Sequence, residues 1–291
     1  MQRKAKVEDL LEANKVVDYA KNTHDQGITF KSGIIDCTNL MNNVVLTVPD
    51  ASHGSEYEIV AAYGPDGEEI EQLEPFRSQG GRILAIASRE VLELGKTKLH
   101  VIAWGSTVIR RVCRATVQAE TYNLQEAVEH GDLLRAALVD IAGGLGSDKR
   151  RWEAVAASKM IHLWVTDCRS AVDALNRPVM AKIKDKRLGI EVASLRQNLW
   201  RRKDMIDSDP RELDDQPAVS HQTDRCVWCD TDVMMTDPLT KVMDAAKLLQ
   251  VLDTNEWDLT QSIESIQKKR LKQIQRRKTA IEDEADNEEA K

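Results

Sequence analysis

The chain has 291 residues, of which 42% are hydrophobic and only 4% are aromatic. That length is enough to bury the core of one large domain or of two modest ones. Its formal net charge of -7 excludes a uniformly basic nucleic-acid binder but leaves room for a local basic surface.

The cellular compartment is indicated by what the sequence lacks. No apolar run approaches transmembrane length, and the charged start does not resemble a secretory signal. The 5 cysteines are odd in number and lie mostly in apolar runs, which favours reduced thiols over a disulfide framework. We therefore expect a cytoplasmic or nuclear protein with no membrane partner. Because the chain begins inside an amphipathic helix, we also expect it to be a piece of a longer protein.

The first third of the chain predicts a helix followed by an antiparallel meander. Apolar residues recur at helical spacing over 7–22, with charged residues mostly opposite. The polar stretch 52–78 reads as an exposed insertion, with a strand expected inside it at 57–63 and a turn at 64–67. The other expected strands, bounded by turn residues or rich in β-branched ones, are 28–30, 43–48, 81–87 and 98–104.

The strongest helical pattern covers 116–141, where Thr116 is the expected N-cap. Its expected core stripe consists of Leu124, Ala127, Val128, Leu134, Ala137, Leu138 and Ile141. The segments expected beyond it are strands at 161–166 and 226–229 and helices at 170–176, at 187–203 and from Asp237 onward. This order of elements is α+β with one mixed sheet. The acidic stretch 204–224 reads as a flexible loop, and 260–291 as a charged helical tail that is partly disordered.

Four carboxylates occupy positions where such a fold can bring them together. Asp50 and Asp167 each close an apolar run, and Glu120 lies one turn into the helix expected from residue 116. Asp237 opens the last segment. Carboxylate oxygens suit Mg²⁺, with Mn²⁺ as a substitute, and several of them can hold two ions about 4 Å apart.

The sequence around these acids resembles the ribonuclease H domain of copia-type retrotransposon polyproteins. The similar segments, in chain order, are 44–51, 103–106, 114–122, 166–171 and 235–241. The first looks like the family's first strand, which ends in Asp-Ala, and the others look like "SWSS", "LSSTEAEY", "CDNQSA" and "LADILTK". Residues 11–23 are similar to the "KRVLRYLKGT" helix that joins reverse transcriptase to ribonuclease H in these elements. Each motif is weak alone, but five in order make a strong joint signal over residues 7–245.

The resemblance implies a ribonuclease H-like mixed five-stranded sheet flanked by helices, with a charged C-terminal helix. Residues 1–40 would be the connection from reverse transcriptase, 41–259 the ribonuclease H-like domain and 260–291 the tail. The implied partners are an RNA/DNA hybrid and the reverse transcriptase region of a parent polyprotein. The implied activity is divalent-metal-dependent endonuclease cleavage of the RNA strand of the hybrid.

The resemblance also assigns residue roles. Asp50, Glu120 and Asp167 would bind one Mg²⁺ that orients the attacking water, and Asp50 and Asp237 would bind a second ion at the leaving 3′ oxygen. The hybrid would be recognised by its 2′-hydroxyls and groove width. Basic residues expected to contact nucleic acid are Lys186, Arg187, Arg196 and Lys241.

The chain also departs from the family pattern. The segment 186–189 replaces "KHID" and lacks its histidine, Cys168-Arg169 replace Asn-Gln, and the insertion 52–78 is long. These departures motivate an alternative, a catalytically inactive retroelement remnant that serves as a nucleic-acid-binding or structural module. A third possibility is a domain that acts only beside a polymerase, since the chain has no Tyr-x-Asp-Asp signature of its own.

Several features have simpler explanations that stay open at this point. A strand-end aspartate usually caps a turn or a helix. Cys226 and Cys229 have the spacing of half a zinc site but fit a short strand better. The basic run over 182–203 fits a solvated helix face as well as a hybrid-binding ridge. The histidines expected to lie in a loop or to be structural are His53, His130 and His162.

Overall fold

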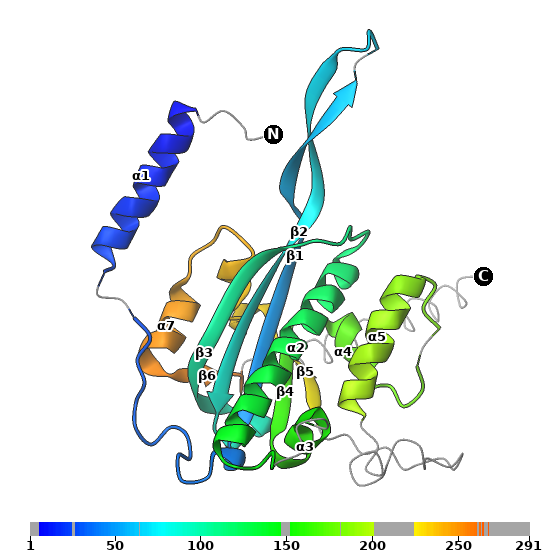
Figure 1. The fold of residues 1–291 in the computed structure, drawn as a ribbon. Coiled ribbons are helices and arrows are strands. Elements are labelled where there is room, and N and C mark those ends of the chain that lie inside the picture. Colours follow the sequence, from blue (N-terminus) through cyan, green and yellow to red (C-terminus); the bar gives the residue numbers. More distant parts are fainter. Residues whose placement is uncertain are drawn as a thin grey trace, which may run out of the picture.

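The structure is a computed structural model that describes residues 6–24, 27–63, 65–146, 152–180, 182–200, 224–260, 262, 264 and 267. Its centre is a six-stranded sheet in the order β5-β4-β1-β2-β3-β6 (Figure 1). The strands are β1 (Val44–Tyr63), β2 (Glu69–Ala87), β3 (Lys96–Ile109), β4 (Ile161–Thr166), β5 (Arg225–Trp228) and β6 (Glu256–Asp258). Neighbours β1, β2, β3 and β6 are antiparallel, whereas β4 lies parallel to β1 and β5 parallel to β4.

This topology confirms the α+β class and the single mixed sheet: an antiparallel meander in chain order, with parallel strands added beside its first strand. The expected number of five strands is wrong, because three residues at Glu256–Asp258 pair with the edge of β3. The strand expected at 28–30 is also wrong. The carbonyl of Thr29 accepts a hydrogen bond from the Asn255 side chain instead of from a neighbouring strand.

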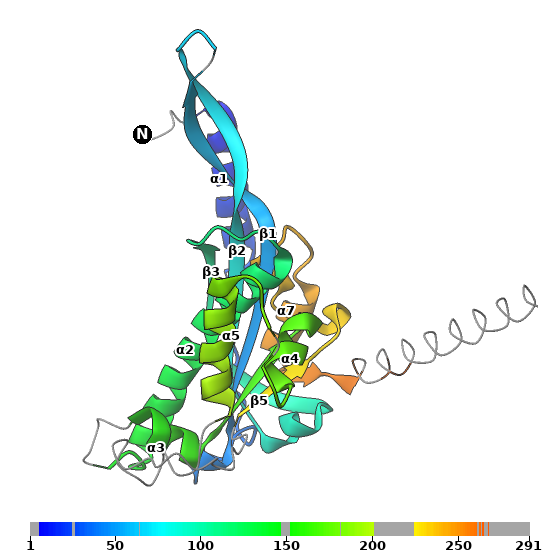
Figure 2. The same cartoon turned by 90° about the vertical axis from the view of Figure 1, so that its right-hand side faces the viewer.

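Helices cover both faces of the sheet (Figure 2). One face carries α2 (Thr116–Ile141), α3 (Trp152–Lys159), α4 (Arg169–Asn176) and α5 (Lys186–Leu199). The other carries α7 (Ala246–Thr254) and the 3-10 turns η2 (Arg89–Glu93), η5 (Thr231–Val233) and η6 (Asp237–Leu239); a further turn, η1 (Leu40–Asn42), precedes β1. Trp164 fills the core between β4 and the first group of helices, and Trp257 packs in the core on the opposite face. Helix α3 was not predicted, and the helix expected from Asp237 onward is divided into the turn η6 and the helix α7.

Helix α2 begins and ends as predicted, but its buried face differs from the expected stripe. Ala137 and Ile141 are exposed, the latter by 75%, while Arg135 is buried in their place. The N-cap position belongs to Ala115 rather than Thr116, and its side chain makes no capping bond. Gln118 instead accepts a hydrogen bond from the Arg114 amide at 2.6 Å, which closes the first turn.

The strand expected at 57–63 inside the insertion 52–78 is confirmed as the outer part of β1. Strands β1 and β2 continue through this insertion as a twisted hairpin arm that projects from the body (Figure 1, top). The register shifts between Ser52 and Glu56 and again between Glu56 and Glu58, which marks the point where the arm leaves the sheet.

The N-terminal helix α1 (Val7–Asn22) forms over the predicted residues, apart from the body of the molecule (Figure 1). Its apolar side chains are exposed, among them Leu10 at 62% and Val16 at 67%. Within the described part of the chain, no helix combines the length and the hydropathy needed to cross a bilayer.

Two other expectations fall largely outside the described residues. These are the charged tail over 260–291 and the flexible loop over 204–224. The last residue assigned to that loop, Asp224, is described, and there the expectation is wrong. Its side chain is fully buried because it pairs with Arg135 at 2.7 Å.

Candidate active site

The register of two parallel strands brings Asp50 and Asp167 together. Val44 of β1 lies beside Ile161 of β4, and the pairing continues to Thr47 and Trp164. Extending the same register by three residues places Asp50 level with Asp167, the first residue after β4. The two apolar runs that each end in an aspartate therefore deliver their carboxylates to one edge of the sheet.

Helix α2 adds the third carboxylate. Glu120 lies in its first turns and is 5% exposed. The Ala51 backbone amide hydrogen-bonds the Glu120 carboxylate and so ties α2 to β1 next to Asp50. One carboxylate oxygen from each of Asp50, Glu120 and Asp167 lies within 4.8 Å of the other two. Three elements far apart in the sequence thus converge on one point.

The fourth acid, Asp237, arrives on η6 from the opposite face of the sheet. The hydroxyl of Thr236 donates to the Val48 carbonyl at 3.0 Å and holds the turn against β1. Gly81, which pairs with Asp50 across β1 and β2, allows this approach. A Cβ at Gly81 would lie 2.8 Å from a Thr240 methyl and 2.9 Å from Leu239 Cβ. Asp237 is 4% exposed and begins a 3-10 turn rather than the expected longer helix.

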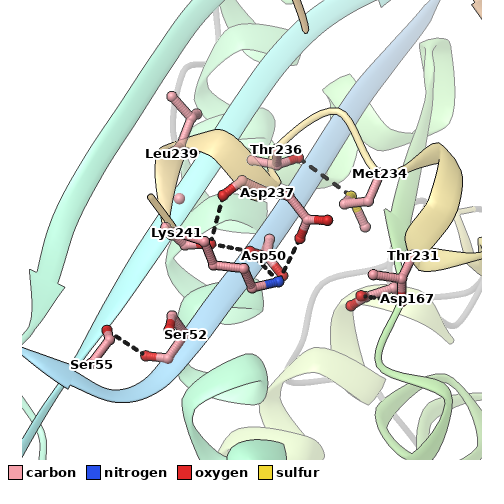
Figure 3. Close-up of polar contacts among 12 residues, drawn as sticks. Asp50, Ser52, Ser55, Asp167, Thr231, Met234, Thr236, Asp237, Leu239 and Lys241 are labelled. Carbon is pink, nitrogen blue, oxygen red and sulfur yellow. Dashed lines mark hydrogen bonds and ion pairs between the residues drawn. The ribbon is translucent and has the colours of Figure 1, made fainter. Parts of the chain in front are cut away.

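Hydroxyl and amide groups fix the orientation of these acids, and sequence reasoning missed them. Thr240 donates to Asp50 Oδ2. Thr231 donates to Asp167 Oδ2 at 2.9 Å, and both residues are labelled in Figure 3. Asn123 of α2 donates to the Asp50 carbonyl at 2.7 Å and so fixes the backbone behind that carboxylate. Thr240 lies inside the family-like segment 235–241, so its place near the acids could have been predicted from the sequence. No motif marks Thr231 or Asn123.

Burial and mutual repulsion make the carboxylates weak acids. Desolvation, opposed by hydrogen bonding to Thr240, raises the pKa of Asp50 to about 6. Desolvation and the charges of Asp50 and Asp167 raise the pKa of Glu120 to about 9. Burial also raises the pKa of Asp167 above its ordinary value. All three groups would become better anions if a cation were placed among them.

One cation of the chain already lies beside two of these acids. The Lys241 ammonium is 2.5 Å from Asp237 Oδ1 and 3.5 Å from Asp50 Oδ2 (Figure 3). Burial lowers the pKa of Lys241, but the hydrogen bond to Asp237 and the surrounding carboxylates outweigh this, so that pKa is raised above its ordinary value. Lys241 therefore remains charged and offsets part of the negative charge.

The arrangement of oxygens fits a divalent metal ion. Among the described residues, Asp50 Oδ1 and Glu120 Oε2 are buried and have no hydrogen-bond donor. Buried carboxylate oxygens are costly to leave without a partner, and hard cations such as Mg²⁺ and Mn²⁺ take oxygen ligands of this kind. The residues that would hold an ion on this ground are Asp50, Glu120 and Asp167.

The basic residues expected to contact nucleic acid differ in their surroundings. Lys186 and Arg187 are exposed at the start of α5, where Asp185 caps the helix and accepts from Gln118 of α2 at 2.8 Å. This places them on the side of the molecule where α2 begins. Arg196 is engaged by the protein itself, because its guanidinium donates to the carbonyls of Ala174, Leu175, Arg177 and Pro178.

His53 makes a local contact, and Cys226 and Cys229 are free thiols. His53 Nε2 contacts the Cys113 carbonyl at 3.0 Å, and a carbonyl can only accept, so this nitrogen carries the proton. Cys226 and Cys229 are buried free thiols at and just after β5. Burial raises the pKa of Cys226 to about 12. Neither thiol belongs to a described cluster that could hold a metal.

Comparison with known proteins gives structural matches at low identity. No protein-family model matches this sequence, and no curated protein matches it. One solved match is the N-terminal RNase H domain of a Mycobacterium tuberculosis protein, fused to maltose binding protein. It has 10% identity and a TM-score of 0.34, over 72% of this chain and 96% of that one.

An RNase H1 isolated from compost by a metagenomic approach matches with 13% identity and a TM-score of 0.36, over 68% of this chain and 92% of that one. The RNase H1 of the halophilic archaeon Halobacterium salinarum matches with 13% identity and a TM-score of 0.25, over 53% and 77%. None of the three shares enough sequence with this chain to transfer a residue role to it.

Proposed function

We propose that this protein is a divalent-metal-dependent endonuclease that hydrolyses the RNA strand of RNA/DNA hybrids. One observation carries the proposal. Three carboxylates from β1, α2 and the end of β4 converge within 4.8 Å, and two of their buried oxygens have no donor among the described residues. Ionised carboxylates in a buried site of this kind are stabilised when a cation compensates their charge, and oxygen-bound divalent cations serve phosphodiester hydrolysis.

In the proposed reaction a water oxygen bonds to phosphorus, the bond from phosphorus to the 3′ oxygen breaks, and the products are a 3′-hydroxyl and a 5′-phosphate. Mg²⁺ or Mn²⁺ supplies Lewis-acid polarisation of the phosphate and a lower pKa for the water. The chain's own residues hold and orient the cation. Asp50 is fixed by Thr240, and Asp167 is fixed by Thr231, so these carboxylates lose little freedom when an ion binds.

The exposed Lys186 and Arg187 would contact the phosphate backbone of the hybrid from the start of α5. Such contacts position the duplex, whereas the 2′-hydroxyls and groove width would distinguish a hybrid from DNA. The exposed face of Arg196 is less available for this purpose, since four backbone carbonyls accept from its guanidinium.

We further propose a copia-type retroelement origin, with residues 1–40 connecting to a reverse transcriptase region and 41–259 forming the nuclease domain. The exposed apolar side chains of α1, such as Leu10 and Val16, support a missing neighbour for that helix. Joining a copia-type polymerase region to the start of the chain should tighten hybrid binding at least about tenfold, measured by fluorescence anisotropy. Equal affinity with and without that region would remove the polymerase partner from the proposal.

The alternative function is an inactive remnant that binds nucleic acid without cutting it. It is favoured by the absent histidine at 186–189. The decisive experiment measures cleavage of a labelled RNA/DNA hybrid with Mg²⁺ and, as the permissive condition, Mn²⁺. Single-stranded RNA and duplex DNA serve as substrate controls. Hydrolysis that follows the protein and disappears with chelator would exclude the remnant.

The variant Asp167→Asn assigns the activity to this site. We expect cleavage to fall by at least about 10³-fold, since one metal ligand is lost. In metal-free buffer its Tm should equal or exceed that of the wild type, because a buried charge has been removed. Asp173→Asn is the matched control: Asp173 lies on α4 with a 54% exposed side chain, so cleavage should be unchanged. Full cleavage by Asp167→Asn would overturn the proposal.

A further inference from the structure

The four acids of the site fall into two halves with different partners. Asp50, Glu120 and Asp167 form the group that could hold an ion, and Asp237 is not a member of that group. Asp237 instead faces Asp50 across the Lys241 ammonium (Figure 3). One half therefore has buried oxygens without a described donor, and the other half already has a cation.

Lys241 is held in this position by the backbone as well as by charge. Its amide donates to the Asp237 carbonyl at 3.0 Å, which places its side chain one turn after that acid. The preceding residue, Thr240, donates from its hydroxyl to Asp50 Oδ2, which gives the backbone a second anchor beside Lys241. The Asp50 and Asp237 side chains are 1% and 6% exposed, whereas that of Lys241 is 39% exposed.

A divalent ion shared by Asp50 and Asp237 would have to occupy the space of this ammonium. Two cations at hydrogen-bonding distance from the same carboxylates repel strongly in a buried site. The ammonium would therefore have to leave, and it would lose a 2.5 Å hydrogen bond to Asp237. The Asp50–Glu120–Asp167 half needs no such displacement, because two of its buried oxygens, Asp50 Oδ1 and Glu120 Oε2, have no hydrogen-bond partner among the described residues.

We propose that the site holds a single divalent ion, bound by Asp50, Glu120 and Asp167, and that the Lys241 ammonium takes the place of a second cation between Asp50 and Asp237. The ion count follows from the contacts of this chain alone. The role of Lys241 towards the substrate rests on the proposed nuclease function. Its partly exposed ammonium would balance negative charge on the phosphodiester, as a second metal ion would. Under the proposed nuclease function, Lys241 would contact the scissile phosphate directly.

Counting bound Mn²⁺ on the whole chain tests this directly. Protein stripped of metal is titrated with Mn²⁺, and the bound ions are counted from the loss of the free-ion electron paramagnetic resonance signal. The wild type should bind one ion at the site, and both Lys241→Met and Lys241→Gln should bind two. Lys96→Met is the matched control, because Lys96 makes an exposed ion pair with Asp258 at 3.8 Å, and it should bind one.

A double variant locates the second ion. Adding Asp237→Asn to Lys241→Met should return the count to one, since the new ion loses half of its ligands. Circular dichroism establishes that each variant is folded, and Lys241→Gln keeps a hydrogen-bond donor for Asp237 if Lys241→Met does not fold. Two ions on the wild type, or one ion on both single variants, would overturn the proposal.

Cleavage separates this inference from the proposed function. A wild type that binds one ion without cutting hybrid would reject the nuclease and keep the ion count. A wild type that cuts hybrid with two bound ions would keep the nuclease and reject the role of Lys241. For an active enzyme, the dependence of rate on Mn²⁺ should have a Hill coefficient of about 1, and Lys241→Met should raise it towards 2.

Discussion

Two clusters of titratable side chains in this protein have similar distances between their ligand atoms but differ in how their negative charge is balanced. Asp132, His162 and Asp224 also place one ligand atom each within 4.8 Å of one another, as the acids of the candidate site do. In that second cluster, however, Arg135 lies 2.5 Å from Asp132 and 2.7 Å from Asp224. The remaining contacts are internal too: His162 Nδ1 lies 3.0 Å from Asp132, and its Nε2 lies 2.6 Å from the Thr47 hydroxyl.

The balance of buried negative and positive charge distinguishes the Asp132–His162–Asp224 cluster, a structural network, from the candidate metal site. Arg135 supplies one guanidinium for two carboxylates, and its side chain is 1% exposed. At the candidate site, Lys241 is the one cation that the described residues place among the four carboxylates. Proximity of acids is therefore a poor criterion for a metal site, and the balance between buried anions and cations is a better one.

The largest stability effect should come from removing the cation of the structural network. Arg135→Met leaves Asp132 and Asp224 buried without their guanidinium, which should lower the free energy of unfolding by about 3–5 kcal/mol. Urea denaturation measures this. Arg82→Met is the control, because Arg82 pairs at 3.0 Å with a Glu126 side chain that is 45% exposed, and it should cost at most about 1 kcal/mol. Equal losses in both variants would contradict the distinction between the clusters.

The next effect is a fall in metal-free stability with rising pH. The pKa of Asp50 is raised to about 6 and that of Glu120 to about 9, so the folded protein retains protons that the unfolded chain has released. The contribution of these two protonated carboxyls to the free energy of unfolding is complete below about pH 4. It is lost as the pH rises through their raised pKa values. The metal-free Tm should therefore fall between pH 5 and pH 9, as about 1.4 kcal/mol accompanies each pKa unit.

Mg²⁺ should reverse this trend, because it binds the ionised carboxylates. The Tm difference between protein with Mg²⁺ and protein with chelator should grow with pH. Thermal melts at matched ionic strength measure both curves. A Tm in chelator that rises from pH 5 to pH 9 would show that these carboxylates are compensated without metal.

Substitutions at two glycines, one in each cluster, should have smaller effects that distinguish stability from cleavage. A Cβ at Gly131 would lie 2.4 Å from the His162 ring and from Thr47 Oγ1, inside the structural network. Gly131→Ala should lower stability by about 1–3 kcal/mol without changing cleavage per folded molecule. Gly81→Ala pushes η6 away from β1 and should instead lower cleavage, by about tenfold. Gly95→Ala, with no atom within 4 Å of its Cβ, is the neutral control for both.

The parts of the fold that the sequence predicted are those with long, regular patterns. The apolar runs that end at Asp50 and Asp167 predicted both strands, and parallel pairing of the two runs is enough to align the acids. The short strand at Glu256–Asp258 could not be predicted, since three residues show no alternation. The buried face of α2 was mispredicted because its polar members, such as Arg135, find partners only in distant segments.

The sequence predicted which acids form the candidate site, but it did not predict the residues that surround them. Asp50, Glu120 and Asp167 meet as the resemblance implied, but their roles as metal ligands stay a prediction. The position of Lys241 depends on the short η6 turn, and nothing in the spacing to Asp237 showed that Asp50 would share its ammonium. A contact between a side chain and two residues, one of them nearly two hundred positions away, is set by tertiary packing.

The continuity of β1 has a consequence for variation in this protein. The same strand carries Asp50 in the body and then runs outward to Tyr63 in the hairpin arm. Cross-strand pairs removed in equal numbers from the distal end would leave Asp50 opposite Gly81, because the inner register is set by neighbours on both sides. The arm can therefore lengthen or shorten over evolutionary time while the chemistry at its base is preserved.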